Sequence, residues 1–371
     1  ERFMNSTRHW LDGLKLRASY GVIGNQNINP YTFTPSMSVN NKATSWIIDD
    51  TYVTSISSLP ALVSQNFTWE KVGTINVGLD VNLFNNRLSG VFEWYQRNTN
   101  GMLAPGVQLP AVVGASAPYQ NTADMRTRGW ELSLNWRDQI GKVGYRIGFN
   151  LSDYKSEIIK YDDNAATKLL SSYYPGQTLG EIWGYVVDGY YTVDDFVDTS
   201  SWQLKEGVTS INGYNVRPGD VKFKNLRDDD TSTNVITSGD NTFDNPGDRK
   251  VIGNTTPRYQ YGINLGMNYA GFDLNVILQG TGKRDYWISN VLTFPMNGDN
   301  FVPLFEGLSD YWMPKDPDNG DWSAVNPNAK YPRIYGNRGN SGSNLRQSDK
   351  YLSDASYLRI KNITLSYKLP K

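Results

Sequence analysis

The sequence contains no cysteine and only one histidine, His9, among 371 residues. Without cysteine, neither a disulfide framework nor a thiolate metal site can form. One isolated histidine also excludes a Ser-His-Asp or Cys-His catalytic group and any multi-histidine metal site. We therefore expect His9 to be an ordinary surface residue, and no motif for catalysis replaces the missing ones.

Charge, long apolar runs and helical periodicity are also scarce. The formal net charge is −1, so no basic field favours nucleic acid as a partner. No stretch approaches the roughly 18 consecutive apolar residues of a membrane helix, and no signal peptide is visible. The sequence opens on "ERFMNSTRHW", without an initiator methionine, and closes on "SYKLPK" inside a strand-like pattern. We expect a fragment of a longer protein.

Strand periodicity, by contrast, is abundant. In "WELSLNW", Trp130, Leu132, Leu134 and Trp136 alternate with polar residues. Successive side chains of a strand point to opposite faces, so such a segment has one apolar and one polar face. Eight segments show this alternation: 14–20, 74–83, 88–95, 130–136, 143–152, 259–269, 272–279 and 363–369.

The connections between these segments alternate strictly between short and long. The short ones are 84–87, 137–142 and 270–271, and the long ones are about 23–68, 103–124, 160–257 and 283–353. In an up-and-down sheet, all short turns then lie at one end and all long loops at the other. Outer-membrane barrels have this arrangement, with short periplasmic turns and long extracellular loops.

Aromatic residues lie near the ends of the apolar stripes, where amphipathic rings favour the level of the lipid headgroups. They are Trp69, Trp130, Trp136, Tyr145, Tyr259, Tyr269 and Phe272. The alternative is that these rings cap a protein core. Because small polar residues on the opposite parity suit a wet or plugged lumen, we expect the apolar face to contact lipid. Only closed barrels let strands cross a bilayer without bare backbone groups.

Several stretches resemble the SusC/RagA family of TonB-dependent outer-membrane transporters. They include "WLDGLKLRASYGVIGNQNI" (10–28), "FTWEKVGTINVGLDVNLFNNRLSGVFEWYQRNTNGML" (67–103), "NTADMRTRGWELSLNW" (121–136), "GEIWGYVVDGYY" (180–191), "VIGNTTPRYQYGINLGMNYAGFDLNVILQG" (251–280) and "NPNAKYPR" (326–333). The most specific is "SDKYLSDASYLRIKNITLSYKLP" (348–370). The resemblance runs in order from near residue 10 to the end.

The resemblance implies an all-β fold, a transmembrane antiparallel β-barrel of 22 strands in the outer membrane. Residues 1–371 would be a C-terminal portion of it, with the plug domain, the TonB box, the early strands and the last strands outside this chain. The implied function is import of nutrients, oligosaccharides or in some members peptides. A SusD-like surface lipoprotein would act as a lid, and the TonB complex would supply energy. The implied protein is not an enzyme, and its surroundings are membrane lipid.

Two alternatives remain open from the residues alone. A passive porin-like or adhesin-like surface barrel would share the strand pattern but lack the plug and the TonB box. A soluble β-enzyme such as a glycosidase could find a pair of carboxylates among 37 acidic residues. No motif supports the enzyme, and the sorted turns oppose it.

Candidate binding residues lie in the long loops, and none of them is catalytic. Exposed aromatic rings suit sugar faces and equally suit a protein interface or packing within a loop. The candidates for contact with cargo are Trp183, Tyr185, Trp202, Trp287, Tyr311 and Trp312, and Trp46 and Trp322 are further loop aromatics.

One segment, 218–254, departs from the family, whose members often carry a compact calcium-like loop there. The candidates for Ca²⁺ are Asp228, Asp229, Asp230 and Asp240. Clustered carboxylates suit Ca²⁺, but a solvated acidic loop is the alternative. No other cofactor is expected. "KDPDNGDW" (315–322) lacks EF-hand spacing and predicts a turn.

Overall fold

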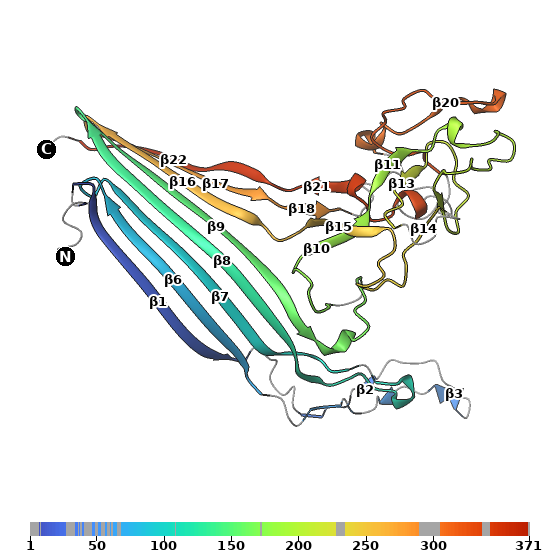
Figure 1. The fold of residues 1–371 in the computed structure, drawn as a ribbon, viewed down its shortest axis with the longest axis horizontal. Coiled ribbons are helices and arrows are strands. Elements are labelled where there is room, and N and C mark those ends of the chain that lie inside the picture. The colour runs from blue at the N-terminus through green and yellow to red at the C-terminus, as the bar shows by residue number, and fades with distance from the viewer. Residues whose placement is uncertain are drawn as a thin grey trace.

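A computed structural model describes Thr7 and residues 9–26, 34–35, 37, 39–40, 47–48, 51–52, 56–57, 60, 62–64, 68–107, 109–170, 173–227, 234–288, 305–335 and 342–369. Its main element is one antiparallel sheet of eight long strands (Figure 1). The strands are β1 (Leu11–Asn25), β6 (Glu70–Leu83), β7 (Leu88–Pro105), β8 (Tyr119–Ile140), β9 (Val143–Tyr161), β16 (Arg258–Tyr269), β17 (Phe272–Lys283) and β22 (Tyr357–Tyr367). All eight predicted strands belong to this sheet.

Each strand pairs with the next long strand along the chain, so the sheet is an up-and-down meander. The short turns lie at the end where both termini are drawn, and the long connections gather at the other end (Figure 1). One of the two-residue turns is Ala270–Gly271, whose φ angles of 48° and 86° are both positive. Such angles match the twist of a two-residue hairpin. The predicted sorting of short and long connections is confirmed.

The register places the two parities on opposite faces of the sheet. Leu79, Phe92, Leu132 and Leu151 form one cross-strand row, and the neighbouring row is Asp80, Val91, Ser133 and Asn150. The apolar face is open: Leu16 is 75% exposed and Leu365 is 67% exposed. Apolar side chains of this kind require a non-aqueous neighbour.

The strands are longer than the sequence pattern predicted. The alternation on β8 covered residues 130–136, whereas the strand has 22 residues. About 9–11 residues suffice to cross a membrane, so half of β8 extends beyond the apolar band. There the outer face is polar, and the alternation that marks a membrane strand disappears. The approximate loop boundaries predicted at 23, 103, 124 and 160 therefore fall inside β1, β7, β8 and β9, whereas β22 begins only at Tyr357, after the loop boundary predicted at 353.

On β22 the register confirms the apolar parity predicted for residues 363–367, and the strand also begins earlier, at Tyr357. A register shift between Ile277 and Leu278 places Ile360 and Leu358 opposite Leu278 and Gly280. Such a bulge adds one residue to a strand and reverses its parity. Residues of even number therefore lie on the apolar face before the bulge, and residues of odd number lie there after it.

The long connections contain short elements. The strands are β2 (Val39–Asn40), β3 (Ile47–Ile48), β4 (Thr51–Tyr52), β5 (Ile56–Ser57), β10 (Glu181–Tyr185), β11 (Val187–Tyr190), β12 (Ser210–Ile211), β13 (Val221–Phe223), β14 (Val235–Ile236), β15 (Arg249–Asn254), β18 (Asp285–Trp287), β19 (Pro314–Asp316), β20 (Asp321–Ala324) and β21 (Leu352–Asp354). The 3-10 helices are η2 (Ala111–Val113), η3 (Asp162–Asn164), η4 (Val193–Asp195), η5 (Glu306–Leu308), η6 (Pro317–Asn319) and η7 (Asp349–Tyr351). In the described part of the chain, no helix is long and apolar enough to cross a membrane.

Candidate functional site

The connections after β9 and after β17 fold together into one unit, which we call the loop body (residues 162–257 and 284–356). Figure 1 shows it at the end of the sheet opposite the short turns. Its largest core is a cluster of buried side chains from the first of these connections: Tyr185, Tyr191, Phe196, Ile211, Val216, Val221, Phe223 and Ile236. A second cluster, Leu308, Tyr331 and Tyr351, comes from the other connection. Long loops with cores of their own hold a defined shape.

A buried carboxylate, Asp220, joins the two connections. It is 2% exposed. Its Oδ2 accepts hydrogen bonds from the Tyr335 hydroxyl at 2.7 Å and from the Arg217 backbone N–H at 2.8 Å. Its Oδ1 accepts one from Asn344 Nδ2 at 2.9 Å, and Asn344 Oδ1 in turn accepts from the Val221 backbone N–H. Removing this carboxylate would leave donors without partners in both connections.

Burial sets the protonation behaviour of this group. Desolvation raises the pKa of Asp220 above its ordinary value, and the hydrogen bonds from Tyr335 and Asn344 oppose that rise. Burial, and then the charge of Asp220, raises the pKa of the Tyr335 hydroxyl. Tyr335 therefore remains a hydrogen-bond donor throughout the physiological pH range.

A ladder of alternating cations and aromatic rings runs beside Asp220. The Arg217 guanidinium lies 5.6 Å from the centre of the Trp202 ring. Trp202 meets Trp322 edge to face, with ring centres 5.1 Å apart. Arg333 lies 4.9 Å from the Trp322 ring and 5.1 Å from the Tyr335 ring. Trp202 and Arg217 come from the connection after β9, and Trp322, Arg333 and Tyr335 come from the connection after β17. These contacts therefore also hold the two connections together.

Of the six rings predicted to contact cargo, three are buried within the loop body. Trp183 is 9% exposed, Tyr185 is 7% exposed and Trp312 is 3% exposed. Trp183 Nε1 donates to Glu181 Oε1 at 2.7 Å, and burial raises the pKa of that carboxyl group. Gly219, with φ of +89°, makes room for Trp312, because a Cβ there would lie 2.3 Å from the indole. These rings hold the loop body together.

The other three candidate rings, Trp202, Trp287 and Tyr311, are partly buried. Contact between cargo and any of the six stays a prediction. Trp46 lies outside the described residues. The sequence reasoning missed Asp220, Asn344 and Tyr335. Asp220 lies more than a hundred residues before the other two, in a different connection. No local spacing signals such a pairing.

The loop body is fixed to the sheet at the place where β9 and β16 diverge. Their last paired residues are Ser152 and Gln260. Beyond this point the backbone of residues 176–179 pairs with β9, through hydrogen bonds such as Ile158 N–H to Gln177 at 2.9 Å and Leu179 N–H to Ser156 at 2.9 Å. The loop body is thus joined to the sheet by backbone hydrogen bonds along β9 and not by a flexible linker alone.

Comparison with known proteins places this architecture. The chain is 28% identical over 372 residues to TonB-dependent receptor P3 of Formosa agariphila, covering 96% of this chain and 32% of that protein. It is 26% identical over 368 residues to TonB-dependent receptor SusC of Bacteroides thetaiotaomicron, again covering 96% and 32%. Along almost its whole length, the chain is similar to TonB-dependent receptors of the SusC/RagA family. No protein-family model matches it.

Solved structures of this family share the fold. A structure of the RagAB peptide importer in the "closed-closed" state aligns with a TM-score of 0.68 at 24% identity, covering 97% of this chain and 35% of that one. The "open-open" state aligns with a TM-score of 0.67 at 23% identity. The chain spans about a third of the length of the SusC/RagA relatives it matches. This is a family of outer-membrane transporters and not of enzymes.

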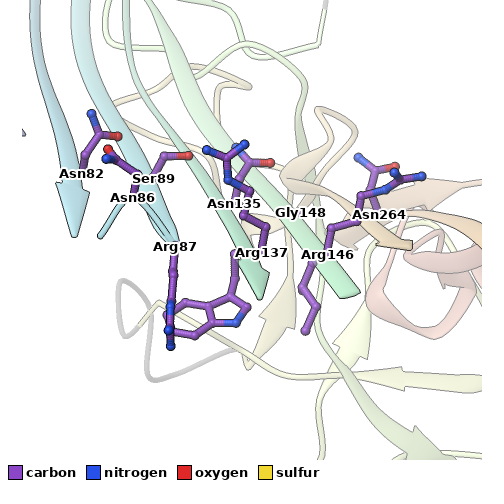
Figure 2. Close-up of a pocket in the computed structure, with 11 residues that line it drawn as sticks. Asn82, Asn86, Arg87, Ser89, Asn135, Arg137, Arg146, Gly148 and Asn264 are labelled. Atoms are coloured by element: carbon purple, nitrogen blue, oxygen red, sulfur yellow. The ribbon is translucent and has the colours of Figure 1, made fainter. Parts of the chain in front are cut away.

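In an outer-membrane receptor of this family, the apolar face of the eight strands contacts lipid and the polar face lines the lumen. Near the short turns the lumen face carries a cavity of about 360 Å³ (Figure 2). Asn82, Ser89, Asn135 and Asn264, which lie in one cross-strand row, contribute amide and hydroxyl groups to its wall. Its floor is polar and hydrogen-bonding.

The calcium prediction concerns four aspartates, of which Asp228, Asp229 and Asp230 lie outside the described residues. The fourth, Asp240, accepts a hydrogen bond from Asn245 Nδ2 at 3.0 Å. Within the described ranges, no group of three or more His, Asp or Glu side chains could hold a metal ion. Calcium binding stays a prediction. At 315–322 the predicted turn is confirmed, since η6 (Pro317–Asn319) follows Asp316, and Gly320 after it adopts a left-handed conformation.

Proposed function

We propose that the chain is part of a TonB-dependent importer of nutrients, with oligosaccharides as the cargo and the loop body as one wall of the cargo chamber. The observation that carries this proposal is the loop body itself: two long connections, each with a core of its own, are joined through Asp220 at the end of the sheet opposite the short turns. Loops of this length are usually functional. Two exposed tyrosines of the loop body, Tyr173 and Tyr286, offer rings on which a sugar can stack.

The partners follow from the same reasoning. We propose a SusD-like lipoprotein as a lid seated on the loop body, and a plug domain, encoded outside these residues, that contacts the polar lumen face near Asn82, Asn135 and Asn264. The TonB complex would act through that missing part. The lid proposal is supported by the match to RagAB, which is a complex with a second subunit by its name, and by the fold shared with it.

Shortening each long connection in the full-length receptor tests the chamber. We expect a strain with residues 162–257 or 284–356 shortened to place the barrel in the outer membrane but to lose growth on the cognate nutrient and to lose lid binding. A matched control shortens another long connection that lies outside the loop body, 106–118. If both shortened receptors reach the membrane and still support normal growth and lid binding, the chamber lies elsewhere.

The class of cargo needs a separate measurement. The purified receptor with its lid would be titrated with a panel of oligosaccharides and with a tryptic peptide mixture. Saturable binding of a glycan alone supports the proposal, and binding of peptides alone replaces oligosaccharides by peptides. Uptake that persists when the proton-motive force is collapsed would favour the porin-like alternative instead.

Cysteine labelling of intact cells tests the orientation, and it is clean because the chain has no cysteine of its own. Asn319→Cys and Ser116→Cys, both exposed on long connections, should react with an impermeant reagent. Asn85→Cys, in the short turn after β6, should not. Reaction at residue 85 with silence at residue 319 would invert the topology.

A further inference from the structure

The lipid-facing side of β8 and β9 carries a column of cross-strand pairs that begins at Trp130, where the apolar band ends, and continues with three pairs of charged residues. In each pair, one residue of β8 lies directly opposite one of β9. In order away from the membrane the pairs are Trp130–Asp153, Arg128–Lys155, Arg126–Glu157 and Asp124–Lys160. The two upper pairs combine opposite charges. Only the pair next to the tryptophan, among these four, places two cations opposite each other.

Arg128 and Lys155 lie on the same face as the lipid-facing residues. The register between Met125 and Ile140 has no shift, so side chains of even number on β8 share the face of Trp130. Gln96 of β7 completes the group, because Arg128 Nε donates to Gln96 Oε1 at 2.8 Å. Both cations are exposed. Like charges directly opposite each other on a sheet destabilise it, unless an anion lies between them.

Two neighbouring carboxylates, those of Asp153 and Glu181, already accept hydrogen bonds from other residues, and a third, that of Glu157, lies on the residue opposite Arg126. Asp153 accepts hydrogen bonds from Arg258 Nε and Nη2, both at 2.5 Å. The charge of Lys155 acts to lower the pKa of the Glu181 carboxyl group on the loop body. This carboxyl group accepts its hydrogen bonds from Trp183 Nε1 and from the Thr178 backbone N–H. Among the residues that the structure describes, neither Arg128 nor Lys155 forms an ion pair with a carboxylate, whereas Arg258 pairs with Asp153.

The height of the pair above the membrane identifies the anion. Trp94 and Trp130 lie directly opposite each other and mark the headgroup level. Two residues further along strands tilted by about 40° correspond to a rise of roughly 5 Å along the membrane normal. The polar layer on each side of the hydrocarbon core is about 5–8 Å deep. The pair thus lies among the outer headgroups.

We propose that Arg128, Lys155 and the Gln96 amide bind a phosphate group of a glycolipid headgroup in the outer leaflet. An arginine and a lysine flanking one phosphate are a charge-assisted site, and the phosphate relieves their mutual repulsion. This lipid site lies on the outside of the barrel and is separate from the proposed cargo chamber.

The test uses the full-length receptor, purified and stripped of lipid, and nanodiscs of phosphatidylcholine with a few per cent of bisphosphorylated lipid A. We expect R128Q/K155Q to weaken retention of the phosphorylated glycolipid by about thirty-fold, from about 1 kcal/mol per cationic side chain at an anionic surface. R128K, which keeps the positive charge, should retain most of the affinity that R128Q loses. Native mass spectrometry measures the retained lipid.

The chain offers a matched control. Arg137 and Arg146 are also two cations directly opposite each other on β8 and β9, but they lie on the lumen face near the short turns. R137Q/R146Q should leave glycolipid retention unchanged. Equal retention by R128Q/K155Q and wild type, or equal retention of dephosphorylated lipid A, overturns the proposal. So does displacement of the glycolipid by millimolar inorganic phosphate, which would identify the site as one for free phosphate.

Discussion

The membrane half of the sheet, next to the short turns, and the loop body place similar apolar side chains in opposite environments. On the sheet, Leu16 and Leu365 are exposed, at 75% and 67%. In the loop body, Val221, Phe223 and Ile236 are fully buried. The solvent explains the difference: lipid covers the apolar face of the sheet, while water surrounds the loop body and drives its apolar residues inward. The same comparison orders the effects expected from substitution.

The largest expected effect is on the lipid face. Leu134→Arg should hinder assembly, because an arginine near the middle of the bilayer costs about 2–4 kcal/mol in a barrel. Ser133→Arg, one residue away on the lumen face, should be far milder. Heat-modifiable mobility of the full-length receptor on gels measures the folded fraction. Ile263→Arg and Asn264→Arg repeat the comparison on β16, and equal effects at both parities would refute the assignment of the faces.

The membrane half of the sheet could be predicted from sequence because lipid and lumen impose alternation on every strand. Trp130 to Trp136 shows this directly, and the register confirms it. Above the membrane, water lies on both faces of residues such as Arg126 and Thr127, so the pattern ends although the strand continues. The loop body was predicted only as long loops. Its contacts, such as Tyr335 to Asp220, join residues 115 positions apart.

The second effect should be confined to the loop body. Asp220→Ala leaves the Tyr335 hydroxyl, Asn344 Nδ2 and the Arg217 N–H without their acceptor. Each buried donor left without a hydrogen-bond acceptor lowers the stability of the fold by about 1–3 kcal/mol. We expect faster hydrogen exchange in residues 185–225 and 342–351, with unchanged exchange in the membrane half of β8. Unchanged protection of the loop body would show that the two connections are held together by other contacts.

A smaller effect is expected for the cation and ring ladder. Trp322→Ala removes the edge-to-face contact with Trp202 and the platform under Arg333. Interactions of this kind contribute about 0.5–2 kcal/mol each. Limited proteolysis should cut the loop body faster in this variant. Trp69→Ala, at the membrane boundary near β6, is the control that should leave this cleavage rate unchanged.

The smallest effect is a pH dependence of the loop body. Burial raises the pKa of Asp220 in the folded chain above its value in the unfolded chain. The folded state then binds more protons than the unfolded state between those two pKa values, so stability falls as pH rises through this window. The contribution is fully present below the unfolded pKa and is lost above the folded one.

Hydrogen exchange of the loop body should therefore slow when a sample at neutral pH is moved into the weakly acidic range, after correction for the intrinsic exchange rate. Asp220→Asn keeps the size of the side chain and removes its titration, so it should flatten this dependence, and an unchanged slope in that variant would assign it to another group.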